Sequence, residues 1–148
     1  MTEVRFYHLQ RMTLDAALSK LLERALDRPM RAVVMAATAE RVEALCGQLW
    51  TYDDRSFLPH GSAADGHAEH QPIWITERDE NPNGAQVLFL LDGLRSENLG
   101  LFDLACVLFN GRDDAAVAQA RTDWKSYKDD GHAVTYWQQT DKGWEQKA

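Results

Sequence analysis

The chain has 148 residues, with 23 acidic and 16 basic side chains and a formal net charge of −7. This length is typical of one domain, and the apolar share of 45% is typical of a globular protein. The acidic balance argues against a protein that grips nucleic acid over a broad surface. Two cysteines are too few for a disulfide scaffold or a four-cysteine zinc site.

The sequence predicts no membrane association. Apolar runs such as 87–91 are far shorter than the roughly 20 residues that span a bilayer. Polar residues also interrupt the first ten positions, which is unlike a signal peptide. We therefore expect a cytoplasmic protein with one domain over 1–148, in which residues from about 140 to 148 form a polar tail that can be flexible.

Apolar periodicity predicts alternating strands and helices. Continuous apolar runs indicate strands that are covered on both faces, and repeats at three and four residues indicate helices. In chain order, the predicted strands are 4–7, 32–36, 72–76, 87–91, 102–109 and 133–137. The predicted helices are 14–27, after the first strand, 39–49, after the second, and 114–130, after the fifth. Apolar residues in 51–71 show no regular spacing. This order is typical of a layered α/β domain.

Several motifs of nucleotide-binding and hydrolytic enzymes are absent from the sequence. No two of the nine glycines are two residues apart, which excludes G-x-G-x-x-G, and no glycine precedes a lysine, which excludes a P-loop. No serine lies in a G-x-S-x-G elbow. These absences argue against an enzyme and predict no cofactor.

Three histidines in the aperiodic segment leave one catalytic alternative. His60, His67 and His70 lie close together in sequence, and imidazoles can ligate zinc at such spacings. Glu69 is the only carboxylate beside them, and a loop rich in glycine and alanine orients ligands poorly. The simpler reading is three solvated loop residues. The alternative is a small metal-dependent hydrolase or another small-molecule enzyme.

The predicted third helix carries an unusual cationic face for so acidic a chain. Arg121, Trp124, Lys125 and Lys128 are separated by three, four and seven positions, so they share one side of a helix. Guanidinium and ammonium groups bind carboxylates, and an indole packs apolar groups. This face would suit an anionic ligand with an apolar part, or it is a solvated face whose tryptophan covers the sheet edge.

A second aromatic cluster lies near Trp50 and Phe57, at the end of the second helix and just beyond it. It is either part of the core or an exposed patch for a protein partner. Of the other tryptophans, Trp74 and Trp137 fall in predicted strands and suit packing, whereas the sequence gives Trp144 no role.

Several segments resemble the chi subunit of the bacterial DNA polymerase III holoenzyme, in order and over nearly the whole chain. They are the opening Val-Arg-Phe-Tyr-His-Leu strand, Leu49-Trp50, Ser56-Phe57-Leu58-Pro59-His60, Pro72-Ile73-Trp74-Ile75, Ala120-Arg121, Trp124-Lys125-Ser126-Tyr127, and Gly131 with the strand after it. Val117 departs from the pattern, because a relative has a lysine there. The resemblance implies a three-layer α/β/α fold with a mostly parallel sheet, Rossmann-like but without a phosphate-binding loop.

The resemblance also implies a non-catalytic adaptor of the clamp loader. Its partners would be the psi subunit and the acidic, apolar-ended C-terminal tail of single-stranded DNA-binding protein, and in some relatives a repair helicase. Contact with nucleic acid would be indirect. The residues implied for the tail are Arg121, Trp124, Lys125, Lys128 and Asn110, and those implied for psi or a helicase are Trp50, Phe57 and Pro59.

Overall fold

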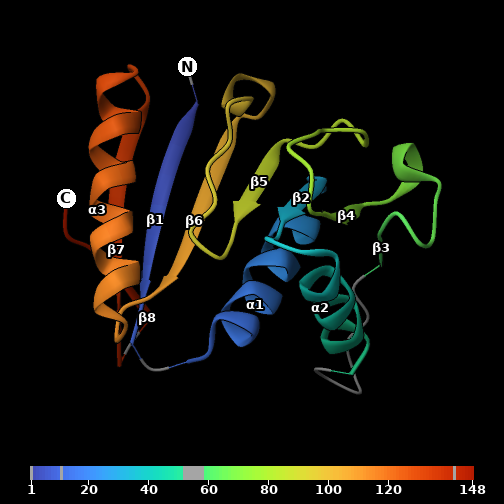
Figure 1. Ribbon diagram of the computed structural model, residues 1–148, viewed down its shortest axis with the longest axis horizontal. Coiled ribbons are helices and arrows are strands. Elements are labelled where there is room, and N and C mark those ends of the chain that lie inside the picture. Colours follow the sequence, from blue (N-terminus) through green and yellow to red (C-terminus); the bar gives the residue numbers. More distant parts are fainter. Residues whose placement is uncertain (1, 11, 52–58, 142) are drawn as a thin grey trace.

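The computed structural model describes residues 2–10, 12–51, 59–141 and 143–148, with the side chains of residues 50 and 51 outside the description. Its centre is an eight-stranded sheet in the order β3-β4-β2-β5-β6-β1-β7-β8 (Figure 1). All neighbouring strands are parallel except β7 and β8. The strands are β1 (Glu3–Leu9), β2 (Ala32–Met35), β3 (His60–Gly61), β4 (Ile73–Thr76), β5 (Val87–Leu90), β6 (Leu104–Asn110), β7 (Ala133–Thr140) and β8 (Gly143–Gln146).

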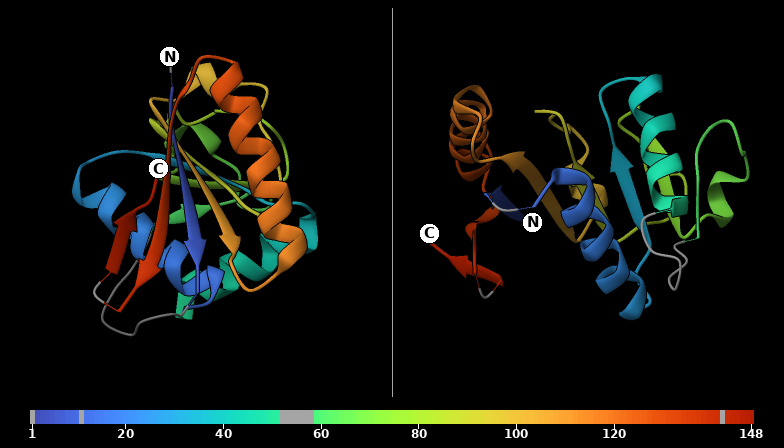
Figure 2. Two further views of the ribbon diagram at one scale, coloured as in Figure 1. Left: turned by 90° about the vertical axis from the view of Figure 1, so that its left-hand side faces the viewer. Right: turned by 90° about the horizontal axis from the view of Figure 1, so that it is seen from below.

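Helices cover both faces of the sheet, which confirms the predicted α/β/α layers. α1 (Leu14–Asp27) and α2 (Ala39–Thr51) pack on one face, and α3 (Asp114–Asp129) packs on the other (Figure 2). The single turns η1 (Ala68–His70) and η2 (Leu99–Leu101) lie in loops. Within the described residues, no helix combines the length and the apolar character needed to cross a membrane.

Side chains that cap the helices set where they begin. The hydroxyl of Thr13 accepts a hydrogen bond from the Ala16 N–H at 3.2 Å, as predicted for an N-cap. The Thr38 hydroxyl does the same for Arg41 at 3.1 Å. All three predicted helices are therefore present at nearly the predicted positions.

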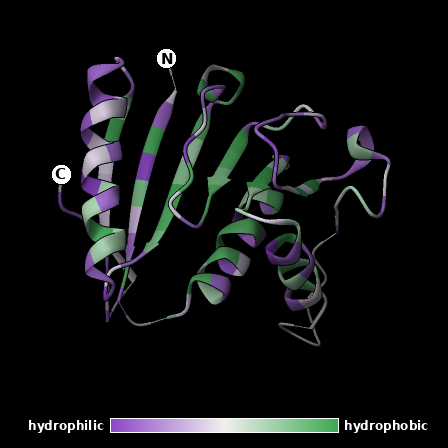
Figure 3. Cartoon of the chain, viewed as in Figure 1, coloured by the Kyte–Doolittle hydropathy of each residue, from purple (hydrophilic) through white to green (hydrophobic). Residues whose placement is uncertain are grey.

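The core lies in two layers, one on each side of the strands. β1 shows the alternation, because Val4 and Phe6 face α3 whereas Tyr7 and Leu9 face α1. Figure 3 shows β5 and β6 as hydrophobic and α3 as largely hydrophilic. The buried faces of the helices hold them on the sheet through apolar burial.

The two ends of the sheet differ from the sequence prediction. The strand predicted at 133–137 is not the edge strand, because Gly143–Gln146, which fall in the predicted polar tail, pair with β7 as β8. Trp144 anchors this strand, with its ring centroid 4.9 Å from that of Tyr7. The short edge strand β3 was also missed. Neither edge carries the continuous apolar run that identifies a central strand.

Candidate functional site

The α3 surface, defined here as Arg121, Trp124, Lys125 and Lys128, combines exposed cations with one anchored ring. The three cationic side chains are exposed, and Trp124 is partly buried. Asp113 begins the helix, because its carboxylate accepts hydrogen bonds from the N–H groups of Ala115 and Ala116. The helical spacing that the sequence predicted is therefore present, and it places the cations outside and the indole toward the sheet.

Trp124 belongs to an aromatic cluster between α3 and the sheet. Its ring centroid lies 5.8 Å from that of Phe6 on β1 and 6.0 Å from that of Tyr136 on β7, both edge to face. Phe109 on β6 contacts Tyr136 at 6.0 Å. Edge-to-face pairs at these distances are favourable beyond simple burial. The indole thus packs directly on β1 and β7, and Phe109 of β6 supports the Tyr136 ring beside it.

Beneath Arg121, His8 and Tyr136 form a polar pair. The His8 Nδ1 and the Tyr136 hydroxyl are hydrogen-bonded at 2.5 Å. Burial lowers the pKa of His8, and the charge of Arg121 lowers it further, whereas a hydrogen bond between the imidazole and the Gly111 backbone opposes both. Burial raises the pKa of Tyr136, against the opposing charge of Arg121. Both groups are consequently neutral near pH 7, so the Arg121 cation faces no negative charge from this pair.

Gly111 is required for this arrangement. A Cβ at position 111 would overlap the imidazole of His8 and lie 2.8 Å from the Leu9 carbonyl oxygen. The Gly111 N–H donates to that same carbonyl at 2.7 Å. The turn after β6 therefore passes close to β1 only because residue 111 has no side chain.

Arg121 has no carboxylate partner within the described part of the chain. Arg95, in the loop after β5, behaves differently toward the same helix, because its Nε lies 3.5 Å from the Asp123 carboxylate of α3 and its Nη2 donates to the Ser126 hydroxyl at 2.6 Å. Asp123 is only 2% exposed, and burial raises the pKa of its carboxyl. On one flank of α3, Asp123 thus pairs with Arg95 and holds the loop after β5 against the helix. The cations of the α3 surface, in contrast, stay available to a ligand.

Asn110 lies at the carboxyl end of β6 and is exposed. It lines two neighbouring cavities of about 490 and 310 Å³, which share only Asn110 and Leu14 among their lining residues. Neither cavity is lined by Arg121 or Trp124. Asn110 is therefore not brought into the same cavity as the α3 surface, and its role stays a prediction.

The second predicted surface is described only in part. Trp50 lies in the last turn of α2, but its side chain is outside the description, and Phe57 lies outside the described residues. Pro59 is partly buried just before β3. The choice between a core cluster and a partner patch therefore stays open for Trp50 and Phe57.

The three loop histidines lie in different local structures. His60 lies in β3, His67 has left-handed backbone with φ of 55°, and His70 ends η1. Among the described residues, no group of three or more histidine, cysteine, aspartate or glutamate side chains could hold a metal ion. The metal-dependent alternative thus has no support in this part of the chain.

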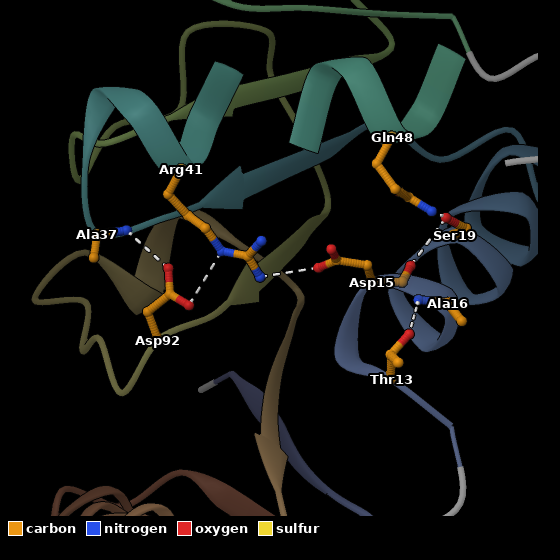
Figure 4. A network of polar contacts seen from close by, with 8 residues as sticks. All are labelled: Thr13, Asp15, Ala16, Ser19, Ala37, Arg41, Gln48 and Asp92. Atoms are coloured by element: carbon orange, nitrogen blue, oxygen red, sulfur yellow. Dashed lines mark hydrogen bonds and ion pairs between the residues drawn. The ribbon is translucent and has the colours of Figure 1, made fainter. Parts of the chain in front are cut away.

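Carboxylates of the chain itself fill the carboxyl edge of the sheet near α1 and α2 (Figure 4). Arg41 on α2 contacts Asp15 of α1 at 2.9 Å and Asp92, after β5, at 3.4 Å. Asp92 also accepts a hydrogen bond from the Ala37 N–H at 3.2 Å. Open α/β sheets commonly bind ligands at this edge. Here an ionic clasp, formed by Arg41, Asp15 and Asp92, joins α1, α2 and the loop after β5.

These features define a class of protein: an α/β/α domain of Rossmann-like architecture with an aromatic-backed cationic helix as its main candidate binding surface. The family then follows from comparison with known proteins. A family model described as DNA polymerase III chi subunit, HolC, matches residues 1–135. The chain belongs to this family of DNA polymerase III accessory subunits, which confirms the resemblance seen in the sequence.

A curated relative agrees with the family. It is described as a probable DNA polymerase III subunit chi from Rickettsia prowazekii (strain Madrid E) and is 33% identical over 91 residues. The match covers 62% of this chain and 55% of the relative. The chain therefore spans about half the length of the curated relative that it matches.

The sequence reasoning missed two residues under the α3 surface, His8 and Tyr136. Both lie on strands that it predicted, but their contact depends on the parallel pairing of β1 with β7, which are far apart in sequence. The alternation of side chains between the two faces of a strand could have indicated this contact. It places His8 on the same face as Phe6, and Tyr136 on the same face as Val134.

Proposed function

We propose that the chain is a non-catalytic adaptor of the polymerase III clamp loader, acting in DNA replication. It would link a psi subunit to the acidic C-terminal tail of single-stranded DNA-binding protein. Membership of the chi family supports the assignment to the replication machinery. The observation that carries the tail site is an exposed arginine without a carboxylate partner among the described residues, placed beside a partly buried indole on α3.

The chemistry of such a tail matches the α3 surface. A disordered peptide that ends in acidic residues, an aromatic ring and a free carboxylate needs a cation and an apolar wall. Arg121 can bind the carboxylate through two parallel hydrogen bonds. Trp124 and the aliphatic stem of Lys125 can pack against the ring. Lys125 and Lys128 would attract the acidic stretch, so we expect binding to weaken as salt is raised.

A peptide titration tests this site. Arg121→Ala should weaken binding of a labelled tail peptide at least tenfold, which is about 1.4 kcal/mol. Arg78→Ala is the matched control, because Arg78 is an exposed arginine just after β4, in a different part of the sheet from the α3 surface. An amidated peptide that lacks the terminal carboxylate should lose a similar amount on the wild-type chain. Equal affinity of the Arg121→Ala and wild-type chains for the free-acid peptide would reject the site.

The psi partner is tested separately at Trp50. If Trp50, Phe57 and Pro59 form an independent surface, Trp50→Ala should abolish capture of psi and leave tail-peptide affinity unchanged. Arg121→Ala should show the reverse pattern. Loss of both partners in either folded variant would contradict two independent surfaces.

A further inference from the structure

The face of β1, β7 and β8 that lies on the α1 side carries two tryptophans that the proposed function does not use. Trp137 on β7 and Trp144 on β8 are both partly buried and pack at the margin of the α1-side core. α1 itself packs over β6, nearer the centre of the sheet. We call Arg5, Tyr7, Trp137 and Trp144 the aromatic platform.

The side chains of the aromatic platform support one another. The Arg5 guanidinium lies 6.0 Å from the centre of the Trp137 ring and pairs with Glu3 at 2.8 Å. The Trp144 ring packs edge to face on Tyr7. The Trp137 Nε1–H donates to the Thr135 hydroxyl at 2.9 Å. The rings are therefore fixed in orientation while part of each indole stays accessible to solvent.

A cavity of about 80 Å³ adjoins the platform and is lined in part by three arginines. Arg5, Arg24 and Arg28 line it together with Tyr7 and Cys106, and its remaining lining is apolar. Arg24 and Arg28 are exposed and, within the described residues, form no ion pair. No acidic side chain is among the lining residues that the structure describes. The cavity thus has the positive charges of Arg24 and Arg28 on its wall, whereas the charge of Arg5 is balanced by Glu3.

The neutral polar groups of the cavity add to this preference for an anion. Burial raises the pKa of the Tyr7 hydroxyl to about 12 and that of the Cys106 thiol to about 12. Both groups are protonated at neutral pH, so they add no negative charge and the hydroxyl can donate a hydrogen bond. Every charge on the wall is positive.

We propose that this cavity and the aromatic platform bind a short segment of single-stranded nucleic acid. One water occupies about 30 Å³ of liquid, so the cavity has room for a single phosphate group, which guanidinium groups bind in a bidentate manner. The neighbouring indoles lie on a flat sheet face, where a base can stack. An amphipathic helix of a partner protein would instead need a hydrophobic groove to receive its apolar face.

This inference goes beyond the proposed function and involves the opposite side of the sheet from the α3 surface. The net charge excludes a broad nucleic-acid footprint but permits contact with one or two phosphates. Such contact is expected to be weak and to fall steeply with salt. A tail peptide and a nucleic-acid segment would then be able to occupy the chain at the same time.

Fluorescence anisotropy of a labelled oligothymidylate of about 10 nucleotides tests the proposal on the full chain at low salt. The double variant Arg24→Ala/Arg28→Ala should lose at least tenfold in affinity. Arg121→Ala/Lys125→Ala is the matched control, since it removes two exposed cations from the other face and should bind like the wild type. Arg5 is left intact because its contacts with Glu3 and Trp137 are part of the fold.

The indole N–H signals of the five tryptophans provide a second measurement. Addition of the oligonucleotide should shift the Trp137 and Trp144 signals and leave the Trp124 signal unchanged. Absence of binding by the wild-type chain at low salt would overturn the proposal, as would equal losses in the two double variants. Binding of oligoglutamate at the platform without binding of the oligonucleotide would also overturn it, in favour of an acidic protein partner. Failure of the tail-peptide test at Arg121 would leave these outcomes unaffected.

Discussion

Two arginines on opposite faces of the sheet are used in different ways. Arg41 is fixed between two carboxylates in the ionic clasp and holds α1 and α2 together. Arg121 projects from α3 above a neutral histidine–tyrosine pair and has no such partner in the described chain. The comparison shows that net charge alone does not locate a binding surface. What matters is whether the surrounding fold neutralises a cation or leaves it for a ligand.

The largest expected effect concerns the packing of α3 on the sheet. Phe6 is completely buried and contacts both Trp124 and Tyr127 of α3. Phe6→Ala should lower the free energy of unfolding by about 3–5 kcal/mol, because it removes a buried ring and leaves a cavity under α3. Urea denaturation measures this loss. Leu101→Ala, at a side chain that is 59% exposed, is the control and should change stability little. Similar losses in both would show that α3 does not depend on this ring.

A smaller effect separates the two arginines directly. Arg41→Ala should lower the free energy of unfolding by about 1–2 kcal/mol, since it leaves Asp15 and Asp92 without their shared cation. The side chains are partly solvated, which limits the loss. Arg121→Ala should change stability by less than about 0.5 kcal/mol. Equal effects in thermal or urea unfolding would remove the distinction between a structural and an available arginine.

The smallest effect concerns Asp123, the buried carboxylate on the other flank of α3. Because burial raises its pKa, the folded chain binds a proton at pH values where the unfolded chain has released it. The carboxyl therefore favours folding most at acidic pH, and this contribution declines as the pH rises through the folded-state pKa. Asp123→Asn removes that dependence.

Asp123→Asn should accordingly be neutral or stabilising by up to about 1 kcal/mol near pH 7, with the advantage shrinking as the pH falls. Denaturation over a range of pH measures the difference between variant and wild type. Gln119→Ala, which removes the amide that donates to Asp123 at 3.0 Å, should shift stability in the destabilising direction. A variant that loses stability mainly at neutral pH would show that the Arg95 ion pair outweighs the cost of burial.

Much of the fold was predictable because its central elements follow strong local patterns. The runs that became β2 and β5 are apolar at every position, and the N-caps of α1 and α3 carry the expected side chains. β3 has only two residues, and β8 alternates a single tryptophan with polar side chains, so neither stands out in the sequence. Edge strands are defined by pairing with a neighbour, which a local pattern does not reveal.

Of the candidate site, only the residues on α3 could be placed together from the sequence. Arg121, Trp124, Lys125 and Lys128 follow helical spacing, so their common placement could be predicted from the sequence. His8, Tyr136 and the role of Gly111 depend on the pairing of strands that are distant in the chain. The buried position of Asp123 was also hidden, because an aspartate in a charged helix is ordinarily a solvated residue.

The central position of β1 has a consequence for synthesis of the protein. Glu3 pairs with Leu104, so during synthesis β1 waits for a neighbour about 100 residues later in the chain, and its other neighbour, β7, comes later still. At about 5–20 residues per second, this wait lasts roughly 5–20 s. The aromatic cluster beneath Arg121 joins side chains from β1, β6, α3 and β7. A nascent chain therefore completes this surface only after β7 has been synthesised, although α3 and its cations are made earlier.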